Sequence, residues 1–109
     1  MGMVSRAVIA RGDVFWVNLD PSVGSEIQKT RPALVVSPAD MNAALPRVII
    51  APITSAGQPM GCRPEVVFQG KTARILLDQV RCVDKVRLGK KMGHIDEKAW
   101  HGVLLEMLA

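Results

Sequence analysis

The stretch VGSEIQKTRPALVVS, residues 23–37, indicates both how this chain folds and where a site can form. Small and charged residues lead up to Arg31, Pro32 follows it, and residues 33–36 are all apolar. Proline fixes φ and cannot donate to a sheet, whereas an apolar run with β-branched residues is typical of a buried strand. The stretch therefore predicts a polar loop that enters a core strand, with Arg31 at the mouth of the strand on a rigid support.

A second stretch has the same form, because the strand predicted at 47–53 is followed by Thr54 and Ser55. Arg31 in front of Pro32 could also be only a solvated residue that flanks a strand. The second stretch, with Thr54 and Ser55 at its end, favours a functional site instead. If the two strands are neighbours, both end in polar side chains at the same rim. We expect Arg31 and Thr54 to meet there.

Short apolar runs separated by turn residues make up most of the chain, as in antiparallel sheets. They predict strands at 14–19, 33–37, 47–53, 65–68, 73–77 and 80–86, turns at 69–72 and 89–93, and a loop at 55–64. Residues 1–10 carry no clear pattern and fit either a loose arm or an early pairing segment.

Two helical segments are also expected. Ser37 as a cap, Pro38 behind it and three alanines predict one or two helical turns that stop at Pro46. Asp96 can cap a C-terminal helix whose apolar side chains recur on one face. That face, expected to pack on the barrel or on a second subunit, consists of Trp100, Val103, Leu104, Met107 and Leu108. The order of elements predicts a mainly β fold, a small antiparallel barrel with a C-terminal helix.

The length of 109 residues fits one domain, and the net charge of +4 permits an anionic partner such as nucleic acid. Cys62 and Cys82 have neither zinc-ligand spacing nor a secretory leader before them, which fits a reducing cytoplasm. No apolar run approaches the roughly 20 residues of a membrane span. We therefore expect a soluble, cytoplasmic protein without a membrane partner.

The sequence gives little support for metal or histidine chemistry. His94 and His101 are the only histidines, each is better explained as structural, and no Cys/His cluster has metal-ligand spacing. Arg31 and Thr54 remain as a guanidinium fork and a hydroxyl that can hold a phosphodiester and stabilise charge that develops on it. Such a site needs no metal or cofactor to cleave RNA if the ribose 2′-hydroxyl is the nucleophile.

Seven short motifs follow one another along the chain: RGDVFWV at 11–17, DP at 20–21, GSE at 24–26, RPA at 31–33, VSP at 36–38, PITS at 52–55 and DQV at 78–80. Each is weak alone, but their order and spacing closely resemble those of the MazF/PemK toxins. The resemblance implies an SH3-like barrel that forms a homodimer and is encoded beside a MazE-like antitoxin. It also implies a metal-independent endoribonuclease that cuts single-stranded mRNA and leaves 2′,3′-cyclic phosphate and 5′-hydroxyl ends.

Carried over by position, the catalytic arginine of the family falls on Arg31 and its catalytic threonine or serine on Thr54. Glu26 lies in the stretch that matches the loop lining the RNA groove, and its carboxylate is chemically easier as the general base than arginine. The identity of the general base is left open between Glu26 and Arg31. The substrate-binding residues expected around this site are Ser25, Gln28, Lys29, Ser55, Asp78 and Gln79.

Two positions depart from the family pattern. Leu76 stands where some members have a contributing arginine, two places before Asp78. Lys29 stands where many members have glycine, so either the loop differs locally or Lys29 adds a phosphate contact.

Two other functions are weighed against the ribonuclease. A gyrase-poisoning toxin of the CcdB type uses a C-terminal Trp-Gly-Ile tail, whereas this sequence ends in Glu-Met-Leu-Ala. A barrel that binds RNA without cutting it would stack bases on aromatic side chains, and the sequence holds two Phe, two Trp and no Tyr. The antitoxin is expected to place an acidic, disordered tail in the RNA groove.

Overall fold

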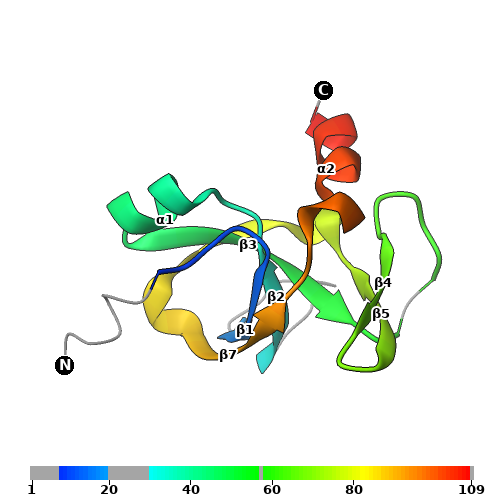
Figure 1. Cartoon of the computed structure of the whole chain (residues 1–109), viewed down its shortest axis with the longest axis horizontal. Coiled ribbons are helices and arrows are strands. Elements are labelled where there is room, and N and C mark those ends of the chain that lie inside the picture. Colours follow the sequence, from blue (N-terminus) through cyan, green and yellow to red (C-terminus); the bar gives the residue numbers. More distant parts are fainter. Residues whose placement is uncertain (1–7, 20–29, 57, 109) are drawn as a thin grey trace.

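The computed structural model describes residues 8–19, 30–56 and 58–108 of the chain (Figure 1). Its strands are β1 (Asp13–Asn18), β2 (Thr30–Val35), β3 (Arg47–Thr54), β4 (Glu65–Phe68), β5 (Lys71–Ile75), β6 (Arg81–Asp84) and β7 (Leu88–His94). The helices are α1 (Ala39–Ala44) and α2 (His101–Leu108), with 3₁₀ turns η2 (Leu77–Gln79), η3 (Lys85–Arg87) and η4 (Glu97–Ala99). No helix in these ranges is long and apolar enough to cross a membrane.

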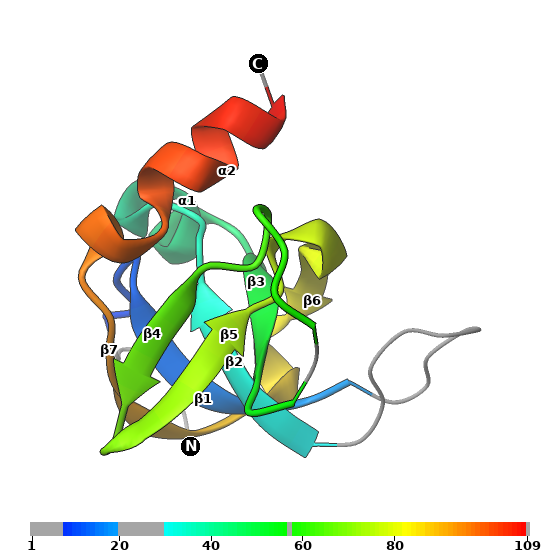
Figure 2. The ribbon, with the colours of Figure 1, turned by 90° about the vertical axis from the view of Figure 1, so that its right-hand side faces the viewer.

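The strands form one antiparallel sheet in the order β4-β5-β3-β2-β1-β7, and β6 pairs with β3 off this path. Strand β3 joins the parts of the sheet, because its first half pairs with β6 and its last two residues pair with β5. The sheet curls so that the β4–β5 hairpin lies across it, and α2 rises at one end (Figure 2). The predicted class, a mainly β barrel-type fold with a C-terminal helix, is confirmed.

Apolar side chains are buried on both faces of the central strands. Side chains alternate along a strand, so Leu34 packs with Trp100 and the β4–β5 hairpin, whereas Val35 packs on the other face with Val48 and Val83. A strand buried on both faces needs an unbroken apolar sequence. This is the physical reason for the apolar run at 33–36.

The turn predicted at 89–93 is wrong, because these residues belong to β7. A Cβ on Gly89 would lie 3.3 Å from the carbonyl oxygen of Trp16, and a Cβ on Gly93 would lie 3.1 Å from the ring of Phe68. The two glycines therefore mark close approach inside the fold, which is the other common reason for glycine in a strand. The strand predicted at 80–86 is also shorter, since the chain turns into η3 after Asp84.

The N-terminal cap predicted for α1 is not Ser37. Pro38 occupies the cap position and no side chain bonds to the helix end. The hydroxyl of Ser37 instead accepts a 3.0 Å hydrogen bond from the backbone N–H of Ile49 and donates to the side-chain oxygen of Asn42. The side chains of Ser37 and Asn42 are both buried. The Ser37 hydroxyl thus bonds to Ile49 and Asn42 instead of capping the helix that follows it.

The C-terminal segment begins with a 3₁₀ turn rather than an α-helix. Asp96 accepts a 2.8 Å hydrogen bond from the backbone N–H of Lys98 and caps η4, and α2 follows from His101. Of the predicted apolar face, Trp100 is buried, and two further side chains pack against its cluster. They are Val103 and Leu104. The outer part of that face, Met107 and Leu108, is exposed.

A buried carboxylate fastens the start of β1 to the end of β7. The side chain of Asp13 is only 3% exposed, and it accepts from the N–H of Ala10 at 3.0 Å, contacts Nδ1 of His94 at 3.0 Å and pairs with Lys91 at 3.4 Å. Burial by itself raises the pKa of Asp13, but these hydrogen bonds and the lysine charge outweigh it and hold the pKa below the ordinary value. The ring of His94 therefore takes part in fastening β1 to β7.

We expect Asp13→Asn to lower the free energy of unfolding by about 2 kcal/mol at pH 7, because an amide cannot accept all of these hydrogen bonds. A lowered folded-state pKa contributes stability that is present above the unfolded pKa of about 3.9 and is lost as the pH falls below it. Urea unfolding at pH 7 and pH 3 should thus show a smaller difference between variant and wild type at pH 3. An equal difference at both pH values would contradict this role, and exposed Asp84→Asn is the control.

Candidate functional site

Arg31 and Thr54 lie at the same rim of the sheet. The β2–β3 ladder pairs Ala33 with Pro52, and each predicted residue lies two positions further along its strand toward that rim. The ladder ends at Ala33 and Pro52. Continued by two residues, its register would set Arg31 across from Thr54, and strand alternation would put both side chains on one face. Both are half-buried. Two residues separated by 23 positions in sequence thus lie on neighbouring strands, each two positions beyond the last pair of the β2–β3 ladder.

The hydroxyl of Thr54 already has one backbone contact. Its Oγ1 accepts a 3.1 Å hydrogen bond from the backbone N–H of Ala56, which orients the side chain at the end of β3. A hydroxyl that accepts can still donate its own proton. This contact leaves the hydroxyl proton of Thr54 available for donation, and Ser55 beside it is exposed.

Asp78 is held by an arginine that the sequence did not single out. Arg63 donates from Nε and Nη2 to the two carboxylate oxygens of Asp78 at 2.9 and 2.8 Å. This hydrogen bonding lowers the pKa of Asp78 and raises that of Arg63, so the pair stays ionised. The predicted contact of Asp78 with RNA stays a prediction, and in the structure its carboxylate faces Arg63. Gln79, the next residue, is half-buried at the end of η2.

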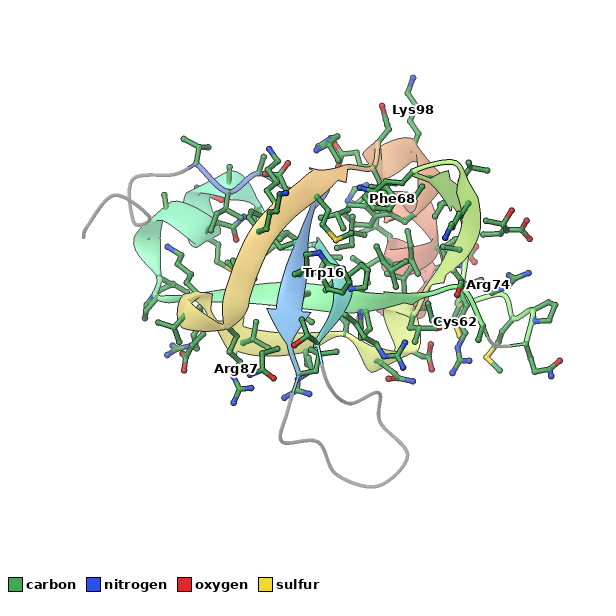
Figure 3. All side chains as sticks on the ribbon, turned by 90° about the horizontal axis from the view of Figure 1, so that it is seen from below. Trp16, Cys62, Phe68, Arg74, Arg87 and Lys98 are labelled. Carbon is green, nitrogen blue, oxygen red and sulfur yellow. The ribbon has the colours of Figure 1, made fainter. Side chains whose placement is uncertain are left out.

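Arg74 is the second arginine that sequence reasoning missed. It is the partner of Thr54 in the β3–β5 ladder, and its guanidinium pairs with Glu65 at 3.0 Å and donates to the carbonyl oxygen of Arg63 at 3.1 Å. Figure 3 shows Arg74 and Cys62 on the same side of the molecule, where β3 ends. A charged position in the otherwise apolar strand 73–77, just after the turn at 69–72, was the one signal that could have marked Arg74.

A pocket of about 210 Å³ lies beside the rim. Pro32 and Ser55, the neighbours of Arg31 and Thr54, line it from β2 and the end of β3, and Phe68 and Met92 contribute apolar surface. The remaining lining residues are Ile53, Gln69, Lys71, Thr72 and Ala73. The pocket combines apolar walls with a lysine, an amide and hydroxyls. Because side chains alternate along a strand, Pro32 and Ile53 line it from the face of the sheet opposite to that of Arg31 and Thr54.

Four predicted site residues, Ser25, Glu26, Gln28 and Lys29, lie outside the described residues. The described residues next to them in sequence are still informative, because Asn18 of β1 pairs with Thr30 of β2. The described ends of β1 and β2 therefore lie side by side next to Arg31. Within the described ranges, no three His, Cys, Asp or Glu side chains gather into a group that could hold a metal ion.

Residues 10–107 match the family described as PemK-like, MazF-like toxin of type II toxin-antitoxin system. The chain belongs to this toxin family. It is 36% identical over 97 residues to the endoribonuclease EndoA of Bacillus subtilis (strain 168), a match that covers 84% of either chain. The family assigned from the seven sequence motifs is thereby confirmed.

Solved structures agree with this assignment. MazF from Deinococcus radiodurans superposes with a TM-score of 0.82 at 26% identity, and the match covers 94% of this chain and 97% of the other. MazF in a MazE-MazF structure from the same organism superposes with a TM-score of 0.74 at 26% identity, covering 94% and 96%. Both matches span nearly the whole of either chain.

Proposed function

We propose that this chain is the toxin of a type II toxin-antitoxin system and acts as an endoribonuclease on single-stranded mRNA in the cytoplasm. The relative named EndoA is an endoribonuclease, and the family is described as toxins of such systems. The observation that supports the proposal most directly is the β2–β3 pairing, whose register, continued two residues past Ala33 and Pro52, would set Arg31 across from Thr54 at one rim. A guanidinium and an oriented hydroxyl on one face are a suitable site for a phosphodiester.

In the proposed reaction the ribose 2′-oxygen attacks the adjacent phosphorus. The new bond joins the 2′-oxygen to phosphorus, the bond from phosphorus to the 5′-oxygen breaks, and the 5′-oxygen takes up a proton. The products are a 2′,3′-cyclic phosphate and a 5′-hydroxyl. Arg31 and Thr54 donate hydrogen bonds to the phosphoryl oxygens as negative charge develops on them. No metal or cofactor takes part in these steps.

The proton of the 2′-hydroxyl needs an acceptor. A guanidinium has too high a pKa to give up a proton readily, so we assign the general base to Glu26. The residues that bind RNA in this proposal are Ser25, Gln28, Lys29, Ser55 and Gln79. The lysine contacts phosphate, and the amide side chains contact bases. The net charge of +4 favours this polyanionic substrate.

The partners we propose are a MazE-like antitoxin and a second copy of the chain. The MazE-MazF structure from Deinococcus radiodurans supports the antitoxin. An acidic, disordered antitoxin segment would occupy the RNA groove and fold there. The exposed apolar side chains Leu105 and Leu108 on α2 support a second subunit, because apolar surface of this kind is usually covered.

The test is cleavage of a long single-stranded RNA in excess EDTA with the product ends mapped. We expect cuts at a short recurring sequence that leave cyclic phosphate and 5′-hydroxyl ends at an undiminished rate. Loss of cleavage in EDTA with recovery on adding Mg²⁺ would contradict the metal-independent mechanism. Intact RNA under both conditions would contradict the ribonuclease function. Trapped gyrase cleavage complexes would then identify a gyrase poison, and RNA binding without cleavage would identify a non-catalytic RNA-binding barrel.

A further inference from the structure

We infer that Arg63 and Asp78 form a clamp that positions residues 58–64 beside Thr54 for RNA cleavage. This role deepens the proposed endoribonuclease function and rests on it. Arg63 and Asp78 are then positioning residues, which hold the 58–64 segment in place. Asp78 acts through Arg63 and does not contact the RNA.

The first step is the geometry of the pair. Two parallel hydrogen bonds of 2.9 and 2.8 Å join the guanidinium of Arg63 to both oxygens of Asp78. The two side chains are only 20% and 30% exposed. Exposed single ion pairs contribute little, but a two-bond arginine–carboxylate fork fixes orientation as well as distance. The pair therefore sets the direction in which the chain approaches β4.

The second step is that backbone contacts hold the same segment. Arg74 donates to the carbonyl oxygen of Arg63 at 3.1 Å, and the N–H of Ile75 donates to the carbonyl oxygen of Pro64 at 3.0 Å. The N–H of Arg63 closes a turn on the carbonyl oxygen of Met60 at 2.9 Å. The end of the 58–64 segment is thus fastened along β5 and η2.

The third step connects these contacts to the site. Arg74 is the ladder partner of Thr54, and the N–H of Leu76 donates to the carbonyl oxygen of Pro52 at 2.8 Å. The clamp is therefore attached to β3 at Thr54 itself and two residues before it. A shift of Arg63 therefore acts on Arg74, the residue that pairs with Thr54.

The fourth step is electrostatic. An isolated carboxylate near an RNA phosphate would repel it, whereas Asp78 is neutralised by Arg63. A carboxylate kept ionised by a guanidinium is also a poor proton acceptor at neutral pH. These properties suit an anchor for the 58–64 segment, and they do not suit a general base.

The test combines RNA kinetics with amide hydrogen exchange in the full chain. We expect Arg63→Ala and Asp78→Ala each to raise KM by about 10- to 100-fold with a much smaller change in kcat, and to broaden the set of cleaved RNA sequences. Exchange of residues 58–64 should accelerate in both variants. Arg63→Lys keeps the charge but not the fork and should fall between Arg63→Ala and wild type.

The double variant and the charge swap decide whether the two residues act together. Residues of one clamp are non-additive, so the double alanine variant should be little worse than either single variant. The swap of Arg63→Asp with Asp78→Arg should recover part of the loss. The control is Glu97→Gln. It removes the 3.7 Å ion pair with Arg11, which lies near the start of β1, whereas Arg31 pairs near the end of that strand, so we expect it to leave cleavage unchanged.

Two results would overturn the clamp. Additive losses with unchanged exchange would mean that the residues act separately, and a loss of kcat in Asp78→Ala alone would place Asp78 at the RNA. Failure of the proposed function is distinguishable, because wild-type protein would then leave RNA intact while hydrogen exchange still reports whether Arg63 and Asp78 hold residues 58–64.

Discussion

Arg31→Ala is expected to lower kcat for RNA cleavage by about 100-fold or more, which corresponds to about 3 kcal/mol of transition-state stabilisation. The variant loses the planar set of donors that holds the phosphoryl oxygens while negative charge develops on them. Single-turnover cleavage with saturating enzyme measures this step directly. Arg31→Lys keeps the charge but cannot form the same two-bond contact, so we expect its rate to lie between those of the wild type and Arg31→Ala.

Arg47→Ala is the matched control for this prediction. Arg47 begins β3, is exposed and lies seven positions before Thr54, so its removal changes the net charge equally without touching the rim. We expect nearly wild-type cleavage from Arg47→Ala. Near wild-type cleavage by Arg31→Ala, in a variant that melts like the wild type, would remove Arg31 from the mechanism and leave the strand register as a structural feature only.

The rim was predictable because its signals are local. Proline follows Arg31 directly and polar residues follow the strand that ends at Thr54, so both strand ends are visible in the sequence. What the sequence could not supply is the pairing of β2 with β3, which depends on contacts between residues far apart. The expected meeting of Arg31 and Thr54 was therefore a hypothesis about register. The observed ladder pairs the two strands as far as Ala33 and Pro52, and the meeting itself stays a prediction.

The misassigned parts share one physical cause, namely that tertiary contacts outweigh local preference. Gly89 and Gly93 look like turn residues, but they lie in β7, where a Cβ would meet its neighbours at only 3.3 and 3.1 Å. Ser37 looks like a cap, but its hydroxyl serves Ile49 and Asn42. Arginines that pair across the fold, such as Arg63, are equally invisible, because their carboxylate partners lie many residues away.

Trp100→Ala is expected to lower the free energy of unfolding by about 3–5 kcal/mol, the usual cost of removing a large buried aromatic side chain. Trp100 is fully buried and packs in the cluster that joins the β4–β5 hairpin to the central strands. A loss of this size should lower Tm by roughly 15 °C or more. Urea unfolding at several protein concentrations measures it and separates folding from any effect of subunit association. Trp16→Ala makes the same chemical change at a side chain that is 39% exposed, so it should cost clearly less.

Trp100→Phe separates the volume of the indole from its hydrogen-bonding group. The Nε1 atom of Trp100 is buried, and it has no hydrogen-bond partner among the residues that the structure describes. A buried donor without a partner opposes folding, so phenylalanine, which fills much of the space and has no such donor, should retain most of the stability. We therefore expect Trp100→Phe to lose less than half of what Trp100→Ala loses. Equal losses would mean that the indole N–H finds a partner in solution, and that the anchoring of the C-terminal segment depends on a hydrogen bond rather than on packing.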